Sequence, residues 1–174
     1  MDKEDIADLL EHKYRTLFNW LEQHDNMQWE IGPEGKWTTG QQVLHLLQSI
    51  KPLNTALSLP KFLLKYKYGV TNRDVRDYDS VIKRYQERLP EAKEATFKGS
   101  QKMTPPKLQD KNYLITRLKV ENKKLQHKVK KWTDKDLDNL ILPHPLMGKM
   151  PVREIIMWSA YHAEHHTKQL MEKY

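Results

Sequence analysis

The sequence predicts an all-α protein, a four-helix bundle whose helices are joined by long crossover connections. Two observations predict this class. Four long segments carry apolar residues every three or four positions, and glycine is scarce, with 6 among 174 residues, while charged residues make up 30%. At this length we expect residues 1–174 to form one domain that buries a substantial core.

Three absences narrow the class of protein. There is no cysteine, so disulfides and thiolate ligands are excluded, and any metal site must use histidine, aspartate or glutamate. The N-terminus is charged and amphipathic rather than shaped like a signal peptide. No apolar run approaches the roughly 20 residues that a membrane span needs. We therefore expect a cytoplasmic protein without a membrane role.

The formal charge of +7 raises the question of a nucleic-acid partner. The basic residues are spread among 23 acidic ones, and the densest lysine run, over residues 123–131, falls on the polar side of a predicted helix. No aromatic platform or known nucleic-acid motif accompanies that run. We interpret it as a solvated face and expect no nucleic-acid partner, although a basic surface favours anionic substrates.

The first helix is predicted over residues 3–23. Its inward stripe holds one polar residue, Lys13, and consists of Ile6, Leu9, Leu10, Lys13, Leu17, Trp20 and Leu21. His12 and His24 lie off that stripe and are predicted at the surface. Glycine and proline over residues 32–35 then predict a loop.

The second helix is predicted from about residue 39 towards residue 59. Either Thr38 or Thr39 can cap it, with a glutamine three residues later to complete a capping box. His45 lies off the main apolar stripe, among the small or compact residues Ser49, Pro52 and Ala56. Two interpretations stay open, an imidazole aimed at a cavity or ion and one hydrogen-bonded in a helix seam. The proline predicts a kink or an early end.

The middle of the chain predicts shorter elements. Residues 60–76 mix aromatics with lysines and predict a short helix or long connection over one end of the bundle, with a membrane-surface or partner-binding segment as the alternative. A modest helix is predicted over residues 78–89, ended by Pro90. Residues 97–109 carry glycine and two prolines and predict a crossover loop.

The third long helix is predicted over residues 111–132, with His127 on its exposed side. Residues 133–137 predict a capped turn of helix. Residues 142–150 predict an extended connector, in which His144 stands between Pro143 and Pro145. We consider two roles for His144, acid–base catalysis and a structural role in which the backbone satisfies its ring.

The last helix is predicted from Pro151 to about residue 170. Its inward stripe contains two imidazoles and comprises Val152, Ile155, Ile156, Ser159, His162, Ala163, His166 and Leu170. Residues four apart stand about 6 Å apart along a helix, so His162 and His166 can converge on one metal ion. His165 competes with His166 but lies nearer the edge of the stripe. We favour His166 and expect His165 at the surface or beside the ligands.

Four segments together carry a family resemblance. They are WTTGQQVLHL (residues 37–46), YDSVIKRYQ (78–86), HPLMGKMPVRE (144–154) and YHAEHHTKQ (161–169). In this order and spacing they resemble the DinB-like superfamily, near its YfiT-type branch of metal-dependent hydrolases. The resemblance implies a four-helix bundle in which three histidines, His45, His162 and His166, bind one divalent metal.

The resemblance also implies a metal, a substrate class and an assembly. Zinc or nickel is the expected ion, the substrate is a small molecule, and the protein forms a homodimer. Some relatives transfer bacillithiol or a similar low-molecular-weight thiol to electrophiles. Many relatives carry an aspartate three residues after the first histidine, where this chain has Gln48.

The chemistry of the residues agrees with that implied set. Three neutral imidazoles suit zinc, nickel, copper or ferrous iron and suit magnesium or calcium poorly. Three protein ligands leave a position open for water or a thiol, as in catalytic zinc sites. We expect a metal-dependent hydrolase or thiol S-transferase, with His144 as the weak candidate for a catalytic residue. The alternative is a non-catalytic stress-response or binding protein whose histidines hold a structural ion or none.

Overall fold

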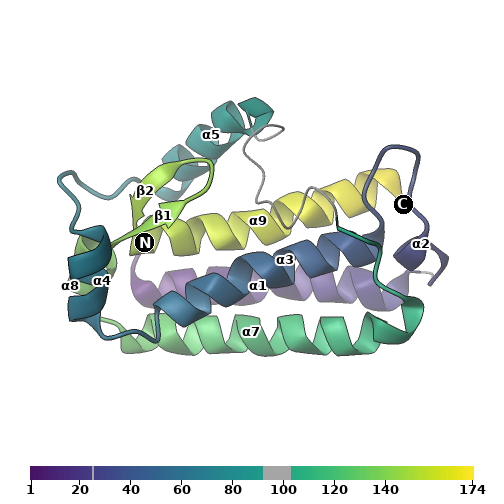
Figure 1. Ribbon diagram of the computed structural model, residues 1–174, viewed down its shortest axis with the longest axis horizontal. Coiled ribbons are helices and arrows are strands. Elements are labelled where there is room, and N and C mark those ends of the chain that lie inside the picture. Colours follow the sequence, from purple (N-terminus) through teal and green to yellow (C-terminus); the bar gives the residue numbers. More distant parts are fainter. Residues whose placement is uncertain (25, 92–102) are drawn as a thin grey trace.

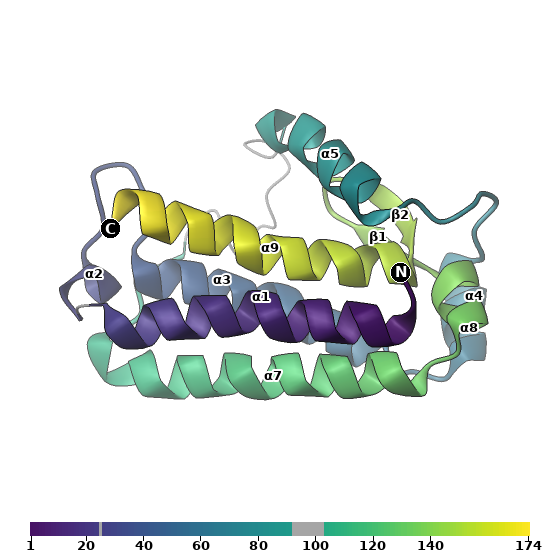
Figure 2. The ribbon, with the colours of Figure 1, turned by 180° about the vertical axis from the view of Figure 1, so that it is seen from behind.

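Four long helices make the body of the protein. The structure is a computed structural model that describes residues 1–24, 26–91 and 103–174. The helices lie side by side with nearly parallel axes (Figures 1 and 2), and they are α1 (Lys3–Gln23), α3 (Thr39–Ala56), α7 (Lys111–Lys131) and α9 (Val152–Lys173). Helix α1 packs against α7 and α9, and α3 packs against the same two helices. The predicted all-α four-helix bundle is confirmed.

Helices α1 and α3 each begin at a side-chain cap. The Asp2 carboxylate accepts from the Asp5 backbone N–H at 2.8 Å and begins α1. Helix α3 has a full capping box: Thr38 Oγ1 accepts from the Gln41 N–H at 3.1 Å, and Gln41 Oε1 accepts from the Thr38 N–H at 2.8 Å. Of the two candidate threonines, Thr38 is therefore the cap.

Pro52 lies inside α3 and does not interrupt it. The helix continues through Pro52 and stops at Ala56, short of the predicted residue 59. Proline removes a single N–H donor, and the Leu57 N–H then closes the last turn by donating to the Leu53 carbonyl at 2.9 Å.

Shorter elements cover the ends and one side of the bundle. They are α2 (Met27–Glu30), α4 (Lys61–Tyr68), α5 (Tyr78–Arg88), η1 (Leu89–Glu91), η2 (Leu108–Asp110) and α8 (Asp134–Asn139). The short helices expected within 60–76, 78–89 and 133–137 are thus present, and α4 and α8 lie at one end of the bundle (Figure 1). Residues 97–102 of the predicted crossover loop over 97–109 lie outside the described residues.

The predicted extended connector is a β-hairpin. Strands β1 (Ile141–His144) and β2 (Gly148–Pro151) pair in antiparallel register, with Ile141 opposite Pro151 and His144 opposite Gly148. Gly148, the first residue after the turn, has a φ of 75°. This positive φ lies in the left-handed region, which glycine adopts more readily than other residues. The backbone is extended on both sides of the turn, as predicted, but the pairing of the two strands was not predicted from sequence. This hairpin leads directly into α9 and lies over its first turns (Figure 2).

The start of α9 is fixed by a buried carboxylate. Glu154 is fully buried and receives two hydrogen bonds from the Arg73 guanidinium at 2.6 and 2.7 Å. The Arg76 backbone N–H donates to it at 2.7 Å. The segment that precedes α5 is therefore held against the first turn of α9.

The predicted core faces are confirmed in the long helices. Every residue of the stripe predicted for the last helix, its two histidines included, is buried. In the parts of the chain that the structure describes, no helix is long and apolar enough to cross a membrane.

Candidate metal centre

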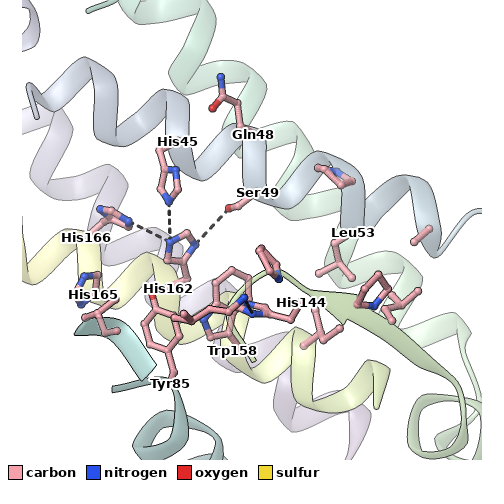
Figure 3. A pocket seen from close by; sticks show the side chains of 18 of the residues that line it. His45, Gln48, Ser49, Leu53, Tyr85, His144, Trp158, His162, His165 and His166 are labelled. Atoms are coloured by element: carbon pink, nitrogen blue, oxygen red, sulfur yellow. Dashed lines mark hydrogen bonds between the residues drawn. The ribbon is translucent and has the colours of Figure 1, made fainter. Parts of the chain in front are cut away.

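Three imidazoles from two helices converge in the seam between α3 and α9. His45 comes from α3, and His162 and His166 come from successive turns of α9 (Figure 3). The Nε2 atom of His162 lies 3.1 Å from Nε2 of His45 and 3.1 Å from Nε2 of His166. One nitrogen from each ring lies within 4.8 Å of the other two. The structure thus brings together the three histidines that the sequence singled out.

Hydrogen bonds on the far side of two rings fix which nitrogen carries the proton. Nδ1 of His162 lies 3.3 Å from Ser49 Oγ, whose own hydroxyl donates to the Leu46 carbonyl at 2.9 Å. Nδ1 of His166 lies 3.2 Å from Gln42 Oε1. Both oxygens act as acceptors there, so both rings are protonated at Nδ1. Their Nε2 atoms consequently carry lone pairs.

Two lone pairs facing each other at 3.1 Å cannot form a hydrogen bond, whereas a cation between them satisfies both. Two nitrogens that bind one zinc ion at 2.0–2.1 Å lie about 2.9 to 3.4 Å apart, depending on the coordination angle. The spacing between His162 and His166 falls in that range. The donor set therefore fits a divalent transition metal.

The rings are also in the charge state that ligands require. Burial, followed by the neighbouring His165, lowers the pKa of His45 to about 4. Burial, followed by the neighbouring imidazoles, holds the pKa values of His162 and His166 well below the ordinary value. All three are neutral at pH 7, which is the form that binds a metal.

Two tryptophans form the walls of the centre. The Trp158 indole stacks on the His162 ring with centroids 4.6 Å apart and planes 20° apart. The Trp37 ring lies parallel to that of His166, with centroids 6.3 Å apart. These contacts hold the imidazoles in place and limit the access of water. Trp158 stands one turn before His162, and this spacing is the sequence signal that could have identified it.

A cavity of about 570 Å³ opens beside the three histidines. Apolar and aromatic side chains make up most of its wall, and they come from α3, α5, the hairpin, α9 and their neighbouring segments. None of the described residues that line it is lysine, arginine, aspartate or glutamate. It is large enough for a small organic molecule.

His165 lies outside the cluster. Its Nε2 accepts from Gln169 Nε2 at 2.9 Å, and the ring lines the cavity without joining the three converging nitrogens (Figure 3). This is the position expected for a residue beside the ligands rather than among them.

His144 is buried at the end of β1 and borders the same cavity. Its Nδ1 accepts from the backbone N–H groups of Leu146 and Met147 at 3.1 and 3.0 Å. The structural role considered from sequence therefore accounts for Nδ1, which the backbone satisfies. It does not account for Nε2, which has no hydrogen-bond partner in the described part of the chain. Its catalytic role stays a prediction.

No carboxylate is available beside the histidines among the described residues. Glu154 is engaged by Arg73 and Arg76, and Glu164 pairs with Lys13 at 2.7 Å and with Lys168 at 2.9 Å. Gln48 lines the cavity, and its Oε1 is buried without a partner in the described structure. A general base of the usual carboxylate kind is thus absent from this wall.

A four-helix bundle with three histidines between α3 and α9 is typical of a class of metal-binding helical proteins, and sequence comparison gives the family. A family model of the DinB superfamily matches residues 9–170, so the chain belongs to that superfamily. No curated protein matches its sequence. The fold is similar to that of YfiT from Bacillus subtilis, a probable metal-dependent hydrolase with an unusual four-helix bundle topology. The TM-score is 0.59 at 19% identity, over 98% of this chain and 84% of that one.

The hydroxyl of Ser49 provides a test of how the centre is held. We expect Ser49→Ala to weaken zinc or nickel binding by about 10- to 100-fold, because partners that orient a ligating imidazole contribute that much. Competition with a chromogenic chelator measures it. Ser58→Ala is the matched control, since Ser58 donates to the Asn54 carbonyl at the other end of the same segment. Equal metal affinity in both variants would contradict the role given to Ser49.

Proposed function

We propose that the protein is a metal-dependent enzyme in which His45, His162 and His166 bind one divalent transition metal, zinc or nickel. The observation that carries the proposal is the convergence of three Nε2 atoms, two of them committed to bear lone pairs by Ser49 and Gln42. Membership of the DinB superfamily and the description of YfiT support the same conclusion.

The bound ion would supply Lewis acidity, lowering the pKa of a water or thiol at a position that the protein leaves open. The chain's own residues prepare the place. Ser49 and Gln42 orient two of the rings, and Trp37 and Trp158 restrict water around them. The cavity would hold a small-molecule substrate beside the three histidines.

Hydrolysis of a small molecule is the first candidate reaction, supported by the similarity to YfiT. Transfer of a low-molecular-weight thiol to an electrophile is the second. The missing carboxylate favours the thiol reaction, because a thiol ionises with less assistance than water and has less need of a general base. In keeping with the family resemblance, we also propose a cytoplasmic homodimer.

Turnover with and without metal tests this function. Purified protein is given a chromogenic ester, or an activated aryl halide together with a small thiol, before and after treatment with EDTA. We expect turnover of one of these substrates, its loss with EDTA, and its recovery with zinc or nickel. If EDTA lowers only the melting temperature and neither substrate reacts in any state, the non-catalytic alternative is correct.

A further inference from the structure

His144 carries a hydrogen-bond donor in the wall of the cavity. Because its Nδ1 accepts from two backbone N–H groups, the ring hydrogen is on Nε2. The residue is 6% exposed, and Nε2 has no hydrogen-bond partner in the described part of the chain. The hairpin turn therefore fixes both the tautomer and the orientation of this donor.

Trp158 presents a second donor beside the first. Its ring contacts that of His144, with centroids 4.2 Å apart and planes 82° apart. The indole Nε1 is buried and also lacks a hydrogen-bond partner among the described residues. Both residues line the same cavity. Native proteins retain few buried donors without an acceptor, so two in contact at a cavity wall indicate that a ligand provides the acceptor.

The remainder of the wall restricts what that ligand is. The side chains near the hairpin end of the cavity are apolar: Pro52, Leu53, Ala56, Leu142, Leu146 and Ile155. No charged side chain lines the described wall, and burial lowers the pKa of His144 to about 4, so its ring is neutral at pH 7. An anionic group at this end would be desolvated without a cationic partner from the protein.

We propose that this end of the cavity binds an uncharged, largely apolar molecule through an oxygen acceptor, such as the carbonyl of an ester, amide or ketone, held by His144 Nε2–H and Trp158 Nε1–H. Since the Trp158 indole also stacks on His162, that oxygen lies one indole ring away from the candidate metal centre. This proposal names a substrate class for the proposed function. The binding of the ligand does not depend on that function, but calling the ligand a substrate does.

Three probes of similar shape test this: acetophenone, ethylbenzene and benzoate, titrated calorimetrically into the full chain as purified. The variant is His144→Asn, because an asparagine oxygen can still accept the turn N–H groups while its shorter side chain withdraws the donor from the cavity. We expect acetophenone to bind about 3- to 10-fold more weakly to the variant, as for loss of one neutral hydrogen bond. Ethylbenzene should bind equally to both proteins.

A second variant and a spectroscopic signal keep the test decisive. Trp158→Phe keeps an aromatic ring and removes the other donor, and it decides the matter if the asparagine variant does not fold. In the wild type the carbonyl stretch of bound acetophenone should move to lower wavenumber, and each variant should reduce that shift.

Unchanged acetophenone affinity and carbonyl frequency in the variants would overturn the proposal. So would an equal loss of benzoate affinity, because the donors would then serve an anion. Metal content is measured in the same samples and is expected to match the wild type. If the protein holds no metal, the proposed function fails while the comparison of variants still decides the ligand class.

Discussion

Replacing Glu154 by alanine is expected to lower the free energy of unfolding by about 3 kcal/mol, the lower end of the range for removing one partner of a buried ion pair. The lower end applies because Arg73 and Arg76 are partly exposed and water can hydrate them once the carboxylate is gone. For a chain of this size the melting temperature should fall by about 6 to 12 °C. Denaturant unfolding and thermal melts measure both quantities.

A carboxylate on the same helix provides the control. Glu164 also makes two ion pairs, but its side chain is 22% exposed, so Glu164→Ala should cost about 0 to 1 kcal/mol. If both alanine variants lose the same stability, burial of Glu154 is not what makes its interactions strong.

The Glu154 pair also makes stability depend on pH. Burial by itself would raise the pKa of Glu154, but the hydrogen bonds and charges from Arg73 and Arg76 outweigh it and hold the pKa below its ordinary 4.5. A carboxyl with a lowered folded-state pKa stabilises fully above the unfolded-state value, and this stabilisation is lost as the pH falls from there through the folded-state pKa. Glu154→Gln should therefore lose less stability than the wild type between neutral and acidic pH.

The second large effect concerns which histidine of α9 belongs to the metal centre. We expect His166→Ala to weaken zinc or nickel binding by more than roughly 100-fold, beyond what an outer hydrogen-bond partner contributes. His166 supplies one of the three converging nitrogens and is buried, while its neighbour His165 is bonded to Gln169. His165→Ala is the matched control and should keep the wild-type affinity. If His165→Ala weakens metal binding and His166→Ala does not, His165 rather than His166 belongs to the metal centre.

The helices could be predicted from sequence because their signals are local. The cap of α3 and the buried stripes lie within a few residues of the positions that they determine. The hairpin was missed because Pro143 and Pro145 suggest an extended chain, while the feature that closes the turn is a side-chain contact from His144 to the backbone N–H groups after it.

The candidate site was harder to predict from the residues alone. Helical spacing pairs His162 with His166, but nothing local connects them to His45, more than a hundred positions earlier; the family resemblance supplied that third histidine. The parts played by Ser49 and Gln42 depend on how α3 lies against α9. The tautomer of His144 depends on the hairpin turn, so its unpartnered donor could not be predicted from sequence.

The most direct test of the metal centre is the metal content of wild-type protein purified without chelator, read with X-ray absorption at the edge of the ion found. The three converging imidazoles predict about one zinc or nickel ion per chain, with three nitrogen ligands of histidine type. Protein that holds no stoichiometric ion, even after zinc and nickel are supplied, would contradict the account. So would an ion bound by fewer than three imidazoles.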